Sequence, residues 1–248
     1  MSVKINYLGR LGNNILQYLM ASYLSSKFDL ALDQPTDLND DFEINKHEGG
    51  RHLENVVEVN DSNVMEFLEK DSINHGLLVN GFFQNKDIFL RQDVLDFYRK
   101  TIIPKYIPNT SDLFVHIRLG DTEDKSNLPY EYYENQMNKI EYHTCFLASD
   151  SPDSKIIKKF RSQYKNVQIL EGWKPSFVIR YGANCDQMLL SAGSFSFCMA
   201  LFRLKNSKVY CIDNQIMTEN LKVIQWDGGM FSAFINKDNF LFYDRYTV

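Results

Sequence analysis

The sequence lacks the features that would place the chain in a membrane, on nucleic acid or around a metal ion. No stretch reaches the roughly 18 apolar residues that cross a bilayer. Acidic residues outnumber basic ones, 32 to 27, whereas a general binder of phosphate backbones carries an excess of Lys and Arg. The four cysteines form no C-x-x-C pair and show no zinc-like spacing with histidine. We therefore expect no nucleic-acid partner, no bound metal and no cofactor.

The first residues also lack a basic stretch followed by an apolar core, so no secretory signal is recognisable. Without an export signal, the cysteines are expected to be reduced thiols that fill core space, and the protein is expected to be cytoplasmic. Peripheral membrane association stays open, and the oligomeric state is not defined. Apolar residues at 44% and charged residues at 24% are ordinary for a soluble globular protein, which argues against disorder.

Two polar breaks, at 33–50 and 103–112, interrupt the periodicity of the chain. A clear apolar strand begins just after the second break, so we predict a domain boundary there, with residues 1–105 and 106–248 forming two units. Short apolar runs alternate with helical patterns in both, which is typical of an α/β fold.

The first unit opens with an apolar strand over 3–7, a glycine-bearing turn and a run of apolar residues at helical spacing. Asn13 is predicted to cap this helix, with Gln17 one turn further along the same face. This arrangement presents backbone N–H groups to an anion. The alternative, a plain connection between a strand and a helix, stays open. The turn lacks G-x-G-x-x-G, which argues against a dinucleotide-dependent oxidoreductase.

The second unit begins with a strand in which His116 and Arg118 share one face and Val115 and Ile117 the other. Open α/β sheets bind ligands at the carboxyl ends of their strands, and a guanidinium fork suits phosphate oxygens. The alternative is an edge strand whose His116 and Arg118 face water. Asp121 is placed in the loop that follows.

Further strands are predicted over 144–148, 167–170 and 188–190. After the first of them come Ser149 and Asp150, and Ser151 is predicted to cap the next helix. After the last comes Gly193, with two hydroxyls before an apolar helical run, which is a second candidate for a helix start that faces phosphate.

Six segments, in order, resemble the motifs of the α-1,2-fucosyltransferases, glycosyltransferase family 11. They are Gly9-Arg10-Leu11-Gly12-Asn13-Asn14-Ile15-Leu16-Gln17-Tyr18, Gly81-Phe82-Phe83-Gln84-Asn85, His116-Ile117-Arg118-Leu119-Gly120-Asp121, Tyr132-Tyr133, the segment 146–150 and Ser194-Phe195-Ser196. The first and third are the more specific, and the others support the register.

This resemblance implies a GT-B fold, in which two Rossmann-like halves face a cleft. It implies inverting, metal-independent transfer of L-fucose from GDP-fucose to a hydroxyl of an acceptor glycan, α-1,2 to galactose. Residues 1–105 would form the acceptor-side half, with 41–71 as its rim, and residues 106–248 the half that binds the nucleotide sugar.

The resemblance also implies roles for individual residues. Arg118 contacts the donor pyrophosphate, His116 lies beside the nucleotide, and Asp121 acts as the base or orients Arg118. The other residues expected to line the donor site are Gly12, Asn13, Ser149, Asp150, Ser194, Phe195 and Ser196, and Gln17 is expected to face the cleft together with Asn13.

Three departures from the family pattern bear on the donor. Leu119 stands where the family has a second arginine, and Phe197 and Cys198 replace a tryptophan pair. Val178 stands where the family carries an acid that could recognise guanine, and 172–185 holds no Asp or Glu. Two other functions therefore stay open: a transferase of the same fold that uses another nucleotide sugar, and a non-catalytic protein that binds a glycan or nucleotide.

Overall fold

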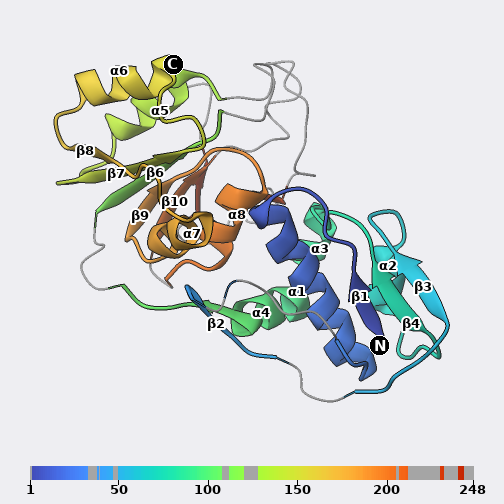
Figure 1. The fold of residues 1–248 in the computed structure, drawn as a ribbon. Coiled ribbons are helices and arrows are strands. Elements are labelled where there is room, and N and C mark those ends of the chain that lie inside the picture. Colours follow the sequence, from blue (N-terminus) through green and yellow to red (C-terminus); the bar gives the residue numbers. More distant parts are fainter. Residues whose placement is uncertain are drawn as a thin grey trace. The chain divides into compact units, whose positions relative to one another are not determined.

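The computed structural model describes residues 2–32, 38, 40–46, 50–107, 112–119, 128–204, 207–211, 230–231 and 240–242. The chain divides into two compact units, Met1–Lys105 and Tyr106–Val248. Each unit is built around a parallel β-sheet with helices packed against it (Figure 1). The acceptor and donor roles assigned to the units remain predictions.

The N-terminal unit contains a three-stranded parallel sheet, in the order β1-β4-β3, and an antiparallel pair, β2 with β5. The strands are β1 (Val3–Ile5), β2 (Phe42–Ile44), β3 (Val56–Val59), β4 (Gly76–Val79) and β5 (Ile102–Pro104). The helices are α1 (Leu11–Phe28), α2 (Val64–Glu69), α3 (Lys86–Leu90) and α4 (Gln92–Thr101). Helix α1 packs against β1, β4 and α4 (Figure 1).

Helix α1 begins earlier than the sequence predicts. The cap position is held by Arg10, so the prediction that Asn13 caps this helix is wrong. The cause lies in the turn: Gly9 adopts a φ of +76°, which only glycine tolerates readily, and the chain enters the helix directly behind it. Asn13 therefore lies in the first helical turn.

The C-terminal unit contains a six-stranded sheet in the order β11-β10-β9-β6-β7-β8, in which every pair is parallel. The strands are β6 (Leu113–Ile117), β7 (Cys145–Ser149), β8 (Val167–Ile169), β9 (Gln187–Leu189), β10 (Lys208–Cys211) and β11 (Phe240–Phe242). The helices are α5 (Tyr130–Met137), α6 (Lys155–Gln163), α7 (Pro175–Ala183) and α8 (Ser194–Leu201). The chain runs outward from β6 to β7 and β8, and then continues with β9 on the other side of β6. The strand order therefore reverses between β6 and β9.

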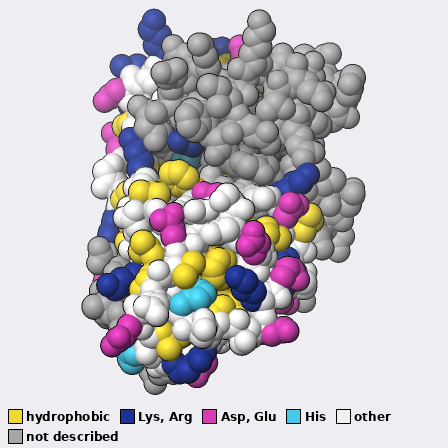
Figure 2. Space-filling model, turned by 90° about the vertical axis from the view of Figure 1, so that its right-hand side faces the viewer, with side chains coloured by type: hydrophobic (Ala, Val, Ile, Leu, Met, Phe, Trp, Pro, Cys, Tyr) yellow, Lys and Arg dark blue, Asp and Glu magenta, His cyan; other side chains and the backbone are white. Residues whose placement is uncertain are grey.

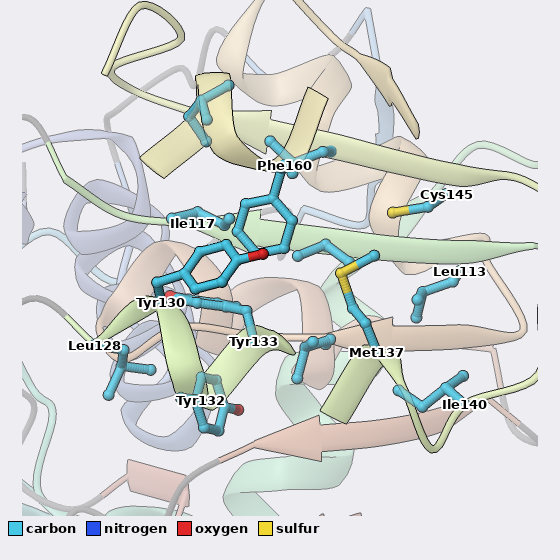
Figure 3. Packing of buried hydrophobic residues seen from close by; sticks show 14 residues of the cluster. Leu113, Ile117, Leu128, Tyr130, Tyr132, Tyr133, Met137, Ile140, Cys145 and Phe160 are labelled. Carbon is cyan, nitrogen blue, oxygen red and sulfur yellow. The ribbon is translucent and has the colours of Figure 1, made fainter. Parts of the chain in front are cut away.

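An aromatic cluster packs α5 and α6 onto one face of this sheet (Figure 3). Phe160 lies against Tyr130 and Tyr133, with ring centroids 4.7 and 6.2 Å away. Ile117 and Leu113 of β6 belong to the same cluster. Because alternate strand residues face opposite sides, this packing directs His116 to the face covered by α7 and α8.

The structure also decides where β6 lies in the sheet, where α6 begins and how the cysteines are placed. Strand β6 lies between β9 and β7, so the alternative of a solvent-facing edge strand is wrong. Helix α6 is capped by Ser154, whose Oγ accepts a hydrogen bond from Ile157 N at 3.3 Å, and the prediction of a cap at Ser151 is wrong. All four cysteines are buried free thiols, as predicted.

The face shown in Figure 2 is mixed in charge. Acidic, basic and apolar side chains are interspersed there over the described residues. Among the residues that the structure describes, no helix is both long enough and apolar enough to span a bilayer.

Candidate active site

Candidate residues of the C-terminal unit, among them His116, Arg118 and the start of α8, lie near the point where the strand order reverses. In open α/β sheets, ligands bind at the carboxyl edge beside such a reversal, because the loops from the two strands diverge there. Here His116 lies in β6 and Arg118 directly follows it, while Ser191 and the start of α8 follow β9. The topology alone therefore makes this edge the first candidate for a ligand site.

His116 lies at the centre of a buried polar triangle. Its Nδ1 is 2.6 Å from Ser196 Oγ and 3.0 Å from Ser191 Oγ, and the two hydroxyl oxygens are 3.0 Å apart. The Phe195 ring covers the imidazole at a centroid distance of 5.0 Å. Only 5% of His116 is exposed, so these contacts fix both the imidazole and the first turn of α8.

The imidazole is neutral at neutral pH. Burial lowers the pKa of His116 to about 4; the charge of Asp150 opposes this shift, and that of Arg118 adds to it. Each serine hydroxyl can donate or accept, so the triangle is satisfied with either tautomer of the imidazole. This arrangement suits a positioning group better than a base that takes up a proton near neutral pH.

Arg118 lies against the backbone that starts α8. Gly193, the cap residue of that helix, has φ +103° and ψ 164°, a region open almost only to glycine. A Cβ atom built on Gly193 would overlap Nη1 of Arg118. The guanidinium therefore reaches the positive end of the helix dipole only because position 193 has no side chain.

The loop after β7 supports the residues next to Arg118. Asp150 Oδ1 accepts a hydrogen bond from Leu119 N at 2.8 Å, and Ser149 Oγ accepts one from Ser151 N at 3.1 Å. Asp150 thus fixes the chain just beyond Arg118, while Ser149 shapes its own turn. Asp121 lies outside the described residues, so its role remains a prediction.

In the N-terminal unit, motif residues gather at the start of α1. Asn13 Oδ1 accepts a hydrogen bond from Gln84 Nε2 at 2.7 Å, and Gly12 is buried in the same turn. Gln17 is fully buried; its amide bonds to both the N–H and the C=O of Leu8, at 3.1 and 3.2 Å, and donates to Gly81 O at 2.9 Å. Gln17 therefore acts as an internal brace, and donor contacts by Gly12 and Asn13 remain predictions.

Sequence reasoning missed Ser191 and the contact made by Gly193. Ser191 belongs to no recognised motif, yet it follows directly after the strand predicted over 188–190. The rule that ligand-site residues follow parallel strands would have found it. The approach of Arg118 to Gly193 joins residues 75 positions apart, and no local pattern carries that information.

No family model and no curated protein matches the chain. Among solved structures, the crystal structure of the NodZ α-1,6-fucosyltransferase soaked with GDP-fucose aligns over 83% of this chain and 95% of that chain, with a TM-score of 0.52 and 10% identity. The chain has a GT-B fold. This confirms the fold class predicted from the sequence. A NodZ fucosyltransferase structure from Bradyrhizobium aligns over 57% of each chain, with a TM-score of 0.40 and 11% identity.

The similarity between this chain and the NodZ structure concerns the GT-B fold alone. At 10% identity it does not carry over the linkage, the acceptor or individual residues. Within the described residues, no group of three His, Cys, Asp or Glu side chains is placed to hold a metal ion.

Proposed function

We propose that this GT-B protein is an inverting glycosyltransferase that moves L-fucose from GDP-fucose to a hydroxyl of an acceptor glycan. The observation that carries the proposal is the placement of Arg118 against Gly193, at the N-terminus of α8 and beside the strand-order reversal. A cation and the positive end of a helix at one point form a site for a diphosphate. The GT-B likeness to a fucosyltransferase crystal soaked with GDP-fucose supports the choice of donor.

In the proposed transfer, negative charge develops on the leaving GDP and positive charge on the sugar. The bond between the anomeric carbon and the phosphate oxygen breaks, GDP leaves with the electron pair, and the acceptor hydroxyl attacks the opposite face and loses its proton. Arg118 and the start of α8 stabilise the growing negative charge on GDP. The sugar centre becomes oxocarbenium-like, so a weak base suffices, and we assign that role, or the orienting of Arg118, to Asp121.

The remaining residues of the C-terminal unit support this anion site. Neutral His116 holds Ser196 and the first turn of α8 in place through the polar triangle. Ser194, Phe195 and Ser196 provide that first turn, and Asp150 fixes the backbone beyond Arg118. Ser149 is proposed to line the same edge. The finer proposal, an α-1,2 linkage to galactose, rests on the sequence resemblance alone.

A second candidate is a transferase of the same fold that uses another nucleotide sugar. Two positions that are charged in the family pattern carry apolar side chains that pack inward here. Leu119 packs against the aromatic cluster, and Val178 is buried in α7. Leu119 supplies no second cation to the donor site, and Val178 cannot read the polar edge of guanine. Calorimetry with GDP, UDP and dTDP separates the two candidates, since a preference for UDP or dTDP would reject GDP-fucose as the donor.

The test of the main proposal is Arg118→Ala, with Arg161→Ala as the matched control. Arg161 makes an exposed ion pair with Glu171 in the same unit, and such pairs contribute little to stability. We expect Arg118→Ala to lower the turnover of GDP-fucose about 10²–10³-fold, the usual loss when one stabilising donor is removed. Thermal melting checks that both variants are folded. Turnover of Arg118→Ala at the wild-type rate would reject the assignment.

A further inference from the structure

Each of the three parallel strands of the N-terminal unit is followed directly by an asparagine. The last residues of β1, β4 and β3 are paired in register, and the next residues along the chain are Asn6, Asn80 and Asn60. Neighbouring strands lie about 5 Å apart, so the three amides form a row along the carboxyl edge of the sheet. This is the edge at which open parallel sheets bind ligands.

Hydrogen bonds connect this row. Asn6 Nδ2 donates to Asn80 Oδ1 at 2.8 Å, and Asn60 Nδ2 donates to Glu58 Oε1 at 3.0 Å. Hydrogen bonds from Asn60 and Asn80 lower the pKa of Glu58, so its carboxyl group is ionised at neutral pH. The edge therefore presents amides and one carboxylate, held in a fixed order.

The loop after β4 is held so that one aromatic ring faces outward. The Asp61 carboxylate accepts hydrogen bonds from Phe82 N at 2.8 Å and from Phe83 N at 2.6 Å. Phe83 has a φ of +55°, which is rare for a bulky residue, and its side chain is buried. Gln17 holds Gly81 from the other side. The result is that Phe82, two residues after Asn80 in the chain, is 42% exposed.

We propose that this edge binds a neutral sugar ring, with Phe82 under its apolar face and Asn6, Asn80 and Glu58 on its hydroxyls. The inference rests on the proposed function and on the prediction from the sequence resemblance that the N-terminal unit takes the acceptor glycan. Sugar hydroxyls both donate and accept, and an amide offers both partners while a carboxylate accepts. Sites of this kind combine an aromatic surface with a few fixed polar groups. The carboxylates of Glu58 and Asp61 disfavour a phosphate here.

The test measures sugar binding without any donor. Saturation-transfer NMR on the full chain uses lactose, cellobiose and N,N′-diacetylchitobiose as probes. We expect at least one of these sugars to bind, and Phe82→Ala to weaken that binding about tenfold through loss of the aromatic contact. Asn6→Ala is expected to weaken it less, because Asn80 and Glu58 remain. Ile103→Ala, at an exposed apolar position on β5, is the matched control and is expected to bind as the wild type does.

A second measurement separates this inference from the proposed function. Hydrolysis of GDP-fucose in the absence of acceptor reports the donor site alone, so Phe82→Ala is expected to hydrolyse normally while its acceptor KM rises. Arg118→Ala is expected to bind the sugar normally and to lose hydrolysis; retained hydrolysis there would reject the donor assignment and leave the sugar result standing. The sugar site is overturned if no probe binds, or if Phe82→Ala and Asn6→Ala both bind like the wild type.

Discussion

Replacement of Gly193 by alanine tests the anion site without replacing a charged residue. The added Cβ has two effects: it forces alanine into a backbone region that glycine almost alone occupies, and it overlaps Nη1 of Arg118. The guanidinium is the end of a flexible side chain, so it moves away and the fold is retained. We therefore expect Gly193→Ala to keep its structure and to lose the aligned cation.

The magnitudes follow from these two effects. The backbone strain costs about 1–3 kcal/mol, which lowers the melting temperature of a chain of this size by roughly 2–12 °C. A displaced guanidinium loses a charge-assisted hydrogen bond worth about 1.5–3 kcal/mol, so GDP affinity should fall roughly 10–100-fold.

Gly172→Ala provides the control within the same unit. Gly172 also has a positive φ, +72°, but a Cβ there meets no atom within 4 Å. This variant is expected to show a comparable loss of melting temperature with unchanged GDP affinity. Calorimetric titration of GDP into both variants, with melting curves alongside, makes the comparison. The reasoning is refuted if Gly193→Ala binds GDP as tightly as Gly172→Ala does.

Two further predictions concern stability. The folded-state pKa of His116 is about 4 and the unfolded one is about 6.5, so the unfolded state binds more protons between these values and stability falls as the pH drops from 6.5 to 4. Urea titrations should show about 3 kcal/mol more acid destabilisation in the wild type than in His116→Asn, and identical pH profiles would contradict this. Gln17→Leu removes the amide partner of the backbone groups of Leu8 and of the buried Gly81 C=O, and should cost about 3 kcal/mol of unfolding free energy. Gln92→Leu, at an exposed amide on α4, should change the unfolding free energy by less than about 0.5 kcal/mol, and equal losses in the two variants would reject the bracing role.

The strands and helices of the C-terminal unit were largely predictable because each carries a local apolar period. The strand over 144–148 and the helical run after Gly193 match β7 and α8 to within a few residues. Their ends were less predictable. Ser151 and Ser154 are both good caps by residue type, and only the structure shows that α6 begins after Ser154.

The candidate site was predictable in part. Alternation along the strand placed His116 and Arg118 on the face opposite Val115 and Ile117, as the structure shows, because side-chain direction in a strand is a local property. The role of Gln17 as a brace and the outward position of Phe82 could not be foreseen. Gln17 bonds to Gly81, 64 positions away, and Phe82 is held by Asp61, 21 positions away.

The sequence by itself determined what repeats or alternates within one segment: the α/β class and the presence of a cation directly after a buried strand. The tertiary structure alone decided which strand ends stand next to one another. Pairing in the order β9-β6-β7 brings Ser191 and Gly193 to His116 and Arg118, and pairing in the order β1-β4-β3 aligns three asparagines. The physical reason is that strand order is set by how the helices cover the whole sheet, and no local pattern encodes that burial.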